Sequence, residues 1–399
     1  MPSAQVSSSR RSFLQLSAAA ATLAGFRLVT EPMLAHAAQR QHAAVDRANS
    51  VFIDSNENPL GPCAAARDAI AAITPEGGRY RDDLSDALVK LFAEQERLNS
   101  DYVRLFAGSS EPLHYSVLAY TSPKRSYVTA DPGFEAGLFM SKISGARVVA
   151  VPLTKTYAHD VRAMLAAAPD AGVIYICNPN NPTGTLTPHS EIEYAVENKP
   201  KDAIVLVDEA YIHFSDAPSA IDLVKADKNI IVLRTFSKAY GMAGIRCGFA
   251  IARPDLLEKL DNFGGNFMPI TAVSAAIASL KDAQLIPERK RVNSAVRAET
   301  FQWLDRNGYT YIPSQSNCFL VDTKRPGKSV IAAMAEQKVI IGRVWPIMPT
   351  WTRITVGTRD EMARFQSAFK RVMDGTVATR PVPAPHKPFW RKNGRPVPA

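Results

Sequence analysis

One lysine in the sequence sits among residue types that suit covalent and anion-binding chemistry. Residues 234–249 read RTFSKAYGMAGIRCGF, which places Lys238 close to two hydroxyl side chains and eight positions before Arg246. A lysine with a lowered pKa is an amine nucleophile, and an arginine with hydroxyls beside it can hold a phosphate. A lysine that merely balances a carboxylate is the simpler alternative, but it leaves the hydroxyls of Thr235 and Ser237 unexplained.

Polar residues that end three other apolar runs can complete such a site. Ser109 and Ser110, in AGSSEP, open a helical pattern whose N-terminus favours an anion, although serine there is also a common N-cap. The loop CNPNNPTG carries Asn181 in a rigid polar segment, for which an ordinary Asx-type turn is the less favoured alternative. Asp208 and Tyr211 lie in IVLVDEAY, where a buried carboxylate needs a cationic partner or a helix to cap.

A pyridine aldehyde that carries a phosphate would use all of these groups. Lys238 would bond to the aldehyde carbon, and Asp208 would pair with the protonated ring nitrogen. Asn181 and Tyr211 would hydrogen-bond the phenolic oxygen of the same ring. Phe134, which follows DPG, would stack on the ring face or, on the simpler interpretation, pack in the core.

The elements that must position these groups are predicted from apolar runs. Six runs lack an in/out alternation, so we expect strands covered on both faces, as in a parallel sheet between helices. Ligands bind at the carboxyl ends of such strands. After about residue 265, long helical patterns and shorter strands indicate a smaller α+β domain. The six runs are 102–108, 125–131, 146–153, 172–177, 203–211 and 229–237.

The chain divides into five predicted segments. The N-terminal sequence SRRSFLQLSAAAATLAGF, followed by AHA, is typical of a twin-arginine export signal, although a disordered basic tail is the alternative. Its apolar stretch is too short for a stable membrane anchor. The segments are the signal peptide (1–37), an N-terminal arm (38–75), a large cofactor-binding domain (76–265), a small C-terminal domain (266–376) and a proline-rich basic tail (377–399).

Charge and cysteine content narrow the function classes. The net charge of the 399-residue chain is +9, but residues 1–37 and 380–399 carry most of it, which leaves +2 on the body between them. A nearly neutral body gives no reason to expect a nucleic-acid partner. The four cysteines form no CxxC or CxxH pair, so we expect small core residues and no metal site.

The motifs together resemble the class I/II aminotransferases of PLP fold type I, and are most similar to the histidinol-phosphate aminotransferase branch. The matching stretches are NENPLGP, RYRDDLSDALVKLFA, GSSE, NPNNPTG, VDEAYIHF, RTFSKAYGMAGIRCGF and RITVGT, in this order along the chain. The resemblance implies an α/β fold. Its large domain has a mostly parallel seven-stranded sheet between helices, and an α+β domain follows.

The resemblance also implies a role for each matching residue, with pyridoxal 5′-phosphate (PLP) as the cofactor. Lys238 matches the Schiff-base lysine, Asp208 the ring-nitrogen partner, and Asn181 and Tyr211 the partners of the phenolic oxygen. Phe134 stands where the branch usually carries a stacking tyrosine. The phosphate ligands that it implies are Ser109, Ser110, Thr235, Ser237 and Arg246.

Further residues are implied to act on the substrate or across a dimer. Tyr80, in RYRD, matches a tyrosine that reaches the phosphate of the neighbouring subunit, which implies a homodimer. Arg353, in RITVGT, matches the arginine that holds the substrate anion, and Asn58 lies in a segment that closes over the substrate. Arg343, Trp345 and Trp351 form a bulky stretch near the substrate pocket, unlike the usual branch pattern, and Arg343 is a further candidate for substrate binding. The two tryptophans favour either a bulky substrate or domain packing.

The expected activity is transfer of an amino group from an amino acid or related amine to a 2-oxo acid. The export signal predicts a periplasmic or secreted enzyme, by a route that moves folded, cofactor-loaded proteins. Because histidine biosynthesis is cytoplasmic, the predicted export favours a substrate other than histidinol phosphate. The alternatives are a PLP-dependent decarboxylase or carbon–sulfur lyase on the same scaffold. A third alternative is a non-catalytic PLP-fold sensor, but the intact set of Lys238, Asp208 and Arg353 argues against it.

Overall fold

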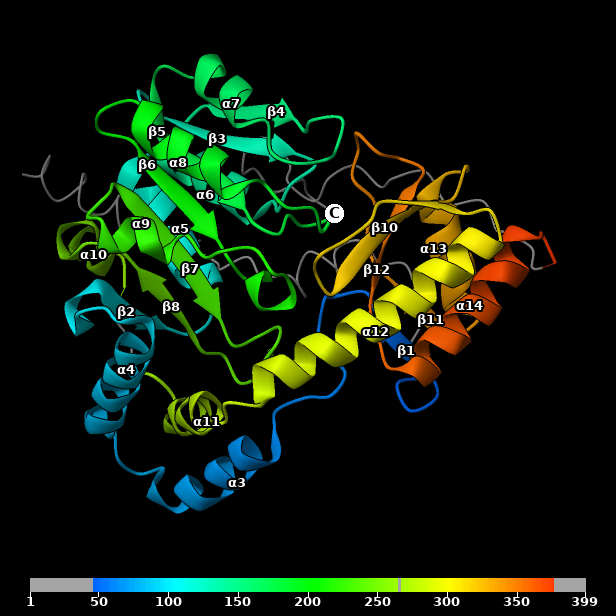
Figure 1. The fold of residues 1–399 in the computed structure, drawn as a ribbon, viewed down its shortest axis with the longest axis horizontal. Helices are drawn as coiled ribbons and strands as arrows, with labels where there is room; N and C mark the ends of the chain where they lie inside the picture. The colour runs from blue at the N-terminus through cyan, green and yellow to red at the C-terminus, as the bar shows by residue number, and fades with distance from the viewer. Residues whose placement is uncertain (1–45, 265–266, 377–399) are drawn as a thin grey trace, which may run out of the picture.

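A computed structural model describes residues 46–264 and 267–376 of the chain. The predicted signal peptide, the tail and the first part of the arm lie outside the described residues. Figure 1 shows two lobes, a larger one built on the main sheet and a smaller one around the C-terminal elements, with a long helix running between them. No helix within the described ranges is long and apolar enough to cross a membrane.

The main sheet has seven strands, of which one runs against the others. The order is β2 (Val103–Phe106), β8 (Gly248–Ile251), β7 (Ile230–Thr235), β6 (Ile204–Asp208), β5 (Ala171–Cys177), β3 (Ser126–Asp131) and β4 (Val148–Pro152). Strand β8 pairs antiparallel with both β2 and β7. The mostly parallel seven-stranded sheet is therefore confirmed, and the six predicted strands are present in it. The run GFAI of β8 was not among them.

Helices cover both faces of this sheet and bury two apolar cores. One face is covered by α5 (Ser110–Tyr120), α6 (Ala136–Ser144) and α10 (Pro254–Asp261). The other is covered by α3 (Ala64–Ile73), α4 (Asp82–Glu96), α7 (Val161–Ala167), α8 (His189–Asn198), α9 (Ile221–Lys225) and α11 (Ile270–Lys281). Double coverage explains why β5, β6 and β7 are apolar throughout. Edge strand β4 differs, since most of its residues are exposed or half-buried.

The smaller lobe has its own core. Its sheet elements are β1 (Val51–Ile53), which pairs parallel with β11 (Val339–Ile341), and the antiparallel set β12 (Trp351–Thr355), β10 (Cys318–Asp322) and β9 (Thr310–Tyr311). Helices α12 (Leu285–Arg306), α13 (Gly327–Glu336) and α14 (Arg359–Met373) pack on them. Helix α14 begins at a capping box in which Thr358 and Glu361 satisfy each other's backbone N–H groups.

The core of the main sheet includes residues that follow residue 265, where the sequence predicted the boundary between the two domains. Helix α11 contributes Val273 and Ala276 to the core of the main sheet. The long α12 carries Leu285 into that same core and Leu304 into the smaller one. At the other end, β1 belongs to the smaller core although it lies in the predicted arm. The apolar faces of α11 and β1 fix these placements, and their partners are distant in sequence.

Candidate functional site

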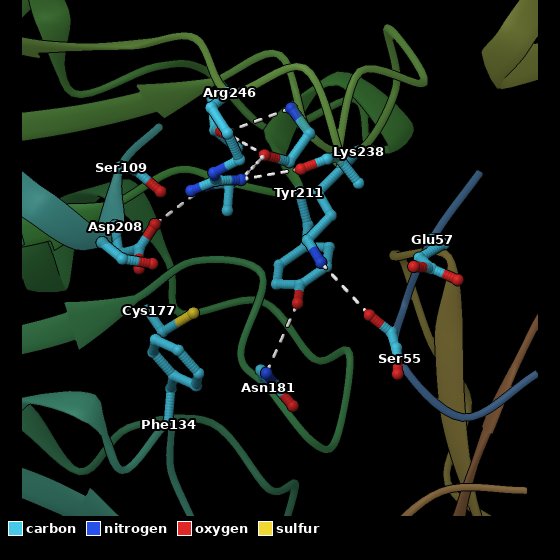
Figure 2. Close-up of a pocket in the computed structure, with 15 residues that line it drawn as sticks. Ser55, Glu57, Ser109, Phe134, Cys177, Asn181, Asp208, Tyr211, Lys238 and Arg246 are labelled. Carbon is cyan, nitrogen blue, oxygen red and sulfur yellow. Dashed lines mark hydrogen bonds between the residues drawn. The ribbon is translucent and has the colours of Figure 1, made fainter. Parts of the chain in front are cut away.

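The predicted chemistry converges on one cavity at the carboxyl ends of β5, β6 and β7 (Figure 2). The N-terminus of α5 and the loop after β7 close it, and the segment after β1 forms one wall. Strand ends meet there because parallel strands terminate at one edge of the sheet. The lining residues are Ser55, Glu57, Ser109, Ser110, Phe134, Cys177, Asn181, Asp208, Ala210, Tyr211, Thr235, Ser237, Lys238, Ala243 and Arg246.

One end of the cavity gathers hydroxyl groups around a guanidinium. Arg246 donates from Nη1 to Ser237 Oγ at 3.0 Å, and the Thr235 hydroxyl donates to the same oxygen at 2.9 Å. Burial lowers the pKa of Arg246 below its ordinary value. Ser109 precedes α5, yet its hydroxyl makes no capping hydrogen bond, so the simple N-cap interpretation does not account for it. Together with the N-terminus of α5, these groups suit a phosphate.

Gly108 lets the backbone approach this end of the cavity closely. Its φ angle of +91° lies in the region that disfavours side chains, and a β-carbon there would collide with the guanidinium of Arg246. The space beside Arg246 therefore depends on the glycine.

Lys238 lies at the centre of the cavity wall and is buried. Its Nζ lies 3.5 Å from the carbonyl oxygen of Ser55 and 5.5 Å from the ring centroid of Tyr211. In Figure 2 its side chain extends toward the segment that carries Ser55. The amine is thus held inside the cavity, within reach of a bound carbonyl compound.

Asp208 ends β6 and is buried at the floor of the cavity. Its Oδ2 accepts from the Tyr175 hydroxyl at 3.0 Å, and its Oδ1 accepts from the Ala210 N–H at 3.1 Å. Burial raises the pKa of Asp208 to about 6, although these hydrogen bonds and the charge of Lys238 act in the opposite direction. A buried carboxylate of this kind is stabilised by a cation that binds next to it.

Tyr211 is the centre of a hydrogen-bond network that the sequence only partly predicted. Its hydroxyl oxygen accepts from Asn181 Nδ2 at 3.3 Å and from Asn56 Nδ2 at 3.0 Å. Asn56 also contacts Thr355 of β12, through both its backbone and its side chain. Sequence reasoning missed Asn56, although it lies in NENPLGP, because Asn58 was chosen from that motif instead.

Arg353 and Arg343 lie outside the lining of the cavity, next to it. Arg353 is buried on β12 and donates from Nη1 to Asn181 Oδ1 at 2.9 Å, which joins it to the site. Arg343 donates to Glu135 at 2.9 Å, and Glu135 directly follows the cavity residue Phe134.

Two further predicted residues are also placed away from the cavity lining. Asn58 donates to the Ala239 carbonyl at 2.9 Å and lines a neighbouring cavity of about 430 Å³ that shares Ser55, Glu57 and Ala243 with the first. Tyr80 is 71% exposed, and its ring stacks on that of Phe267 at 4.3 Å.

The cysteines and tryptophans have structural surroundings. All four cysteines are buried, as predicted, and their thiols are free. Cys177 also lines the cavity, where burial raises its pKa well above the ordinary value. Trp345 and Trp351 belong to one small apolar cluster, which supports the packing interpretation of these residues.

One cluster of potential metal ligands stands apart from the cavity. Among the described residues, His189, Glu193 and Asp222 lie close enough to share an ion. None of the three lines the cavity, so the cluster takes no part in the site.

The donor set of the cavity fits PLP. Hydroxyls, a guanidinium and a helix N-terminus at one end match a phosphate, a buried carboxylate matches a protonated ring nitrogen, and an amine matches an aldehyde. Phe134 also lines the cavity and supplies an aromatic face, which Figure 2 shows below Cys177.

Comparison with known proteins gives consistent matches over most of the chain. Residues 49–369 match the family model for aminotransferase class I and II. Histidinol-phosphate aminotransferase 1 of Cupriavidus pinatubonensis is 35% identical over 338 residues, which cover 82% of this chain and 90% of that protein. The histidinol-phosphate aminotransferase of Symbiobacterium thermophilum is 34% identical over 330 residues, 81% of this chain and 90% of that protein.

A solved structure matches the fold. The histidinol-phosphate aminotransferase of Sinorhizobium meliloti, in complex with pyridoxal-5′-phosphate, has a TM-score of 0.78 at 24% identity and covers 89% of this chain and 97% of that chain. At this identity the match shows the fold, and the bound group agrees with the donor set of the cavity.

Proposed function

Because this chain belongs to the class I and II aminotransferases, we propose that it transfers the amino group of an amino acid or related amine to a 2-oxo acid. The enzyme is a PLP-dependent transaminase of the histidinol-phosphate branch. The donor, the acceptor and the place where it works are parts of the proposal. The observation that carries it is the convergence of Lys238, Asp208 and the anion-binding groups around Arg246 on one cavity.

The cavity residues divide the cofactor between them in this proposal. Arg246 and the hydroxyls near it would hold the phosphate, while Asp208 would keep the ring nitrogen protonated. Asn181 and Tyr211 would hydrogen-bond the phenolic oxygen, and Phe134 would supply an aromatic face to the ring. When bound, PLP supplies an electron sink for the bond that breaks at the substrate Cα. The hydroxyls are those of Ser109, Ser110, Thr235 and Ser237.

The chain's own groups then orient the substrate and move a proton. The amine of Lys238 would accept the proton from the substrate Cα and pass it on within the site. Arg353 holds the substrate anion, so that the Cα–H points to Lys238. Asn58 lies in the segment that covers the substrate. The hydrogen bond from Arg353 to Asn181 supports this arrangement, because it ties the anion subsite to the cofactor subsite.

The test follows the visible absorbance of the purified holoenzyme as single amino acids are added. Conversion of the cofactor to its amine form by one class of amino acid, and its reversal by a 2-oxo acid, is the expected result. Release of carbon dioxide or ammonia without an acceptor would favour the decarboxylase or lyase alternative. No response to any amino acid or phosphorylated amine, in a protein that retains its cofactor, would contradict the proposed activity.

We also propose that the enzyme is a homodimer with shared sites. Tyr80 and Phe267 are 71% and 62% exposed, and stacked exposed aromatic rings favour a partner surface. Sedimentation analysis is expected to give twice the chain mass. Tyr80→Ala is then expected to weaken cofactor retention, whereas an unchanged cofactor affinity in the dimer would contradict the shared site.

The location of the enzyme is a separate proposal that rests on the twin arginines, Arg10 and Arg11. Export by the twin-arginine route is expected to deliver the holoenzyme to the periplasm or medium. Cell fractionation of the wild type and of an Arg10→Lys, Arg11→Lys variant tests it. Equal cytoplasmic retention of both would contradict export.

A further inference from the structure

A buried tyrosine, Tyr175 of β5, contacts Asp208 from outside the lining of the cavity. Its side chain is fully buried, and its hydroxyl donates to Asp208 Oδ2 at 3.0 Å. We propose that Tyr175 is a positioning residue that keeps Asp208 ionised, so that the carboxylate can pair with the protonated ring nitrogen of PLP. The inference deepens the proposed function and rests on it for the identity of the ligand.

The register of β5 and β6 brings the tyrosine to the carboxylate. In these parallel strands Tyr175 pairs with Leu206, and Cys177 pairs with Asp208. Residues two apart on a strand face the same side of the sheet, so Tyr175 and Asp208 are diagonal neighbours on one face. Diagonal neighbours lie within reach of an aromatic side chain. The two strands therefore hold the hydroxyl against a carboxylate that itself lines the cavity.

Opposing effects act on the charge of Asp208, so the loss of one donor changes the balance. Burial raises the pKa of Asp208 to about 6, and the charge of Glu209 adds to that effect. The hydrogen bonds from Tyr175 and the Ala210 N–H act in the opposite direction, as does the charge of Lys238. Burial raises the pKa of Tyr175 well above its ordinary value, so the hydroxyl keeps the proton that it donates. Because a carboxylate gains more from a donor than a neutral carboxyl does, this hydrogen bond favours the ionised form.

The other titratable side chains on the elements around Asp208 are neutral near neutral pH. Burial raises the pKa of the thiol and of the phenol among them above their ordinary values, and lowers the pKa of the imidazoles to about 4 or about 3. Glu111 of α5 and Arg246 of the loop after β7 carry charge, and every test variant retains both. The neutral side chains are those of Cys177, Tyr127, His114, His159 and His213. A difference in pH dependence between wild type and Tyr175→Phe therefore reports the carboxylate of Asp208.

Binding of a cofactor analogue at two pH values tests the inference without turnover. 4′-Deoxypyridoxine 5′-phosphate keeps the ring nitrogen and the phosphate but has no aldehyde, so Lys238 cannot bond to it. By calorimetry, Tyr175→Phe is expected to weaken its binding about fivefold more at pH 6 than at pH 8.5, because a rise of about one unit in the pKa of Asp208 leaves most of the carboxyl protonated at pH 6. Titration of the ligand itself cancels in the comparison with wild type.

Tyr127→Phe is the matched control. Tyr127 is also fully buried, on the neighbouring strand β3, and its ring centroid lies 6.1 Å from that of Tyr175. Within the described part of the chain its hydroxyl makes no hydrogen bond to Asp208. Removal of this hydroxyl should therefore change the affinity by the same factor at both pH values.

Urea unfolding of the cofactor-free protein gives a second measurement that needs no ligand. A group whose pKa is raised in the folded state contributes stability that is lost as the pH rises through that pKa. Wild type should stop losing this stability near the pKa of Asp208, which is about 6. In Tyr175→Phe the loss should continue to a pH about one unit higher, and Tyr127→Phe should follow the wild-type profile.

The outcomes distinguish the inference from the proposed activity. An affinity loss in Tyr175→Phe that is equal at the two pH values, or a pH-dependent loss of the same size in Tyr127→Phe, would overturn the inference. An unfolding profile of Tyr175→Phe that matches wild type would overturn it as well. If both measurements give the expected shifts but the holoenzyme transfers no amino group, the proposed activity is contradicted and the role of Tyr175 stands.

Discussion

The buried carboxylate of Asp208 destabilises the folded protein when no cofactor is bound. Asp208→Asn is therefore predicted to stabilise the cofactor-free form. The side chain is 3% exposed, and burial raises its pKa from 3.8 to about 6, against the effects of Tyr175, Ala210 and Lys238. Because the folded state binds this proton more tightly than the unfolded state does, stability falls as the pH rises from about 4 to 6. Above pH 6 the free energy of unfolding is therefore about 3 kcal/mol lower than it is below pH 4.

Asparagine removes that cost but retains only one side-chain oxygen for the two hydrogen bonds that Asp208 accepts. A lost hydrogen bond costs about 1 kcal/mol, so the expected net gain is about 2 kcal/mol at pH 8. Urea unfolding of the cofactor-free protein measures the gain, which should shrink to about half or less at pH 5, within the titration window. Asp202→Asn, at an exposed position, should change little.

The same substitution is expected to act in the opposite direction in the holoenzyme. Asp208→Asn removes the carboxylate that holds the ring proton, so the variant should retain PLP less well and lose turnover. A variant that is less stable than wild type at pH 8 without cofactor, or a gain that does not depend on pH, would refute the account of Asp208 as a carboxylate strained by burial.

Two further substitutions test the phosphate end of the cavity and the hydrogen-bond network around Tyr211. Gly108→Ala should lower the affinity for PLP by about tenfold or more, because a β-carbon would displace Arg246. Equilibrium dialysis measures this affinity, and an unchanged value would contradict the phosphate subsite. Asn56→Ala removes the 3.0 Å hydrogen bond to Tyr211 and should lower kcat/KM by about tenfold while the cofactor content stays unchanged. Asn49→Ala, at an exposed position, is the control, and equal kinetics in the two variants would exclude a role for Asn56.

The sheet and the central residues of the site could be predicted because the signals for them are local. Continuous apolar runs indicated strands buried on both faces, and the polar residues that end them meet at one edge of the sheet. That geometry brings Asp208, Tyr211 and Lys238 into one cavity, as the sequence predicted. Strand β8 was missed because its run of four residues is short and follows directly on the loop after Lys238.

The remaining features depend on contacts that no local pattern reveals. Asn56 contacts Thr355 across 299 positions, and Arg343 contacts Glu135 across 208. Either arginine near RITVGT could have faced the substrate on sequence grounds alone. In the structure Arg353 donates a hydrogen bond to Asn181, which lines the cavity, and Arg343 pairs with Glu135, beside Phe134.

The identity of the lysine that bonds covalently to the cofactor is the central claim of the account. Borohydride reduction of the holoenzyme, followed by digestion and mass spectrometry, locates that bond directly. We expect a cofactor adduct on the peptide that contains Lys238, and no adduct in Lys238→Ala. An adduct on a different lysine, or one that persists in Lys238→Ala, would contradict the role given to Lys238 and the site built around it.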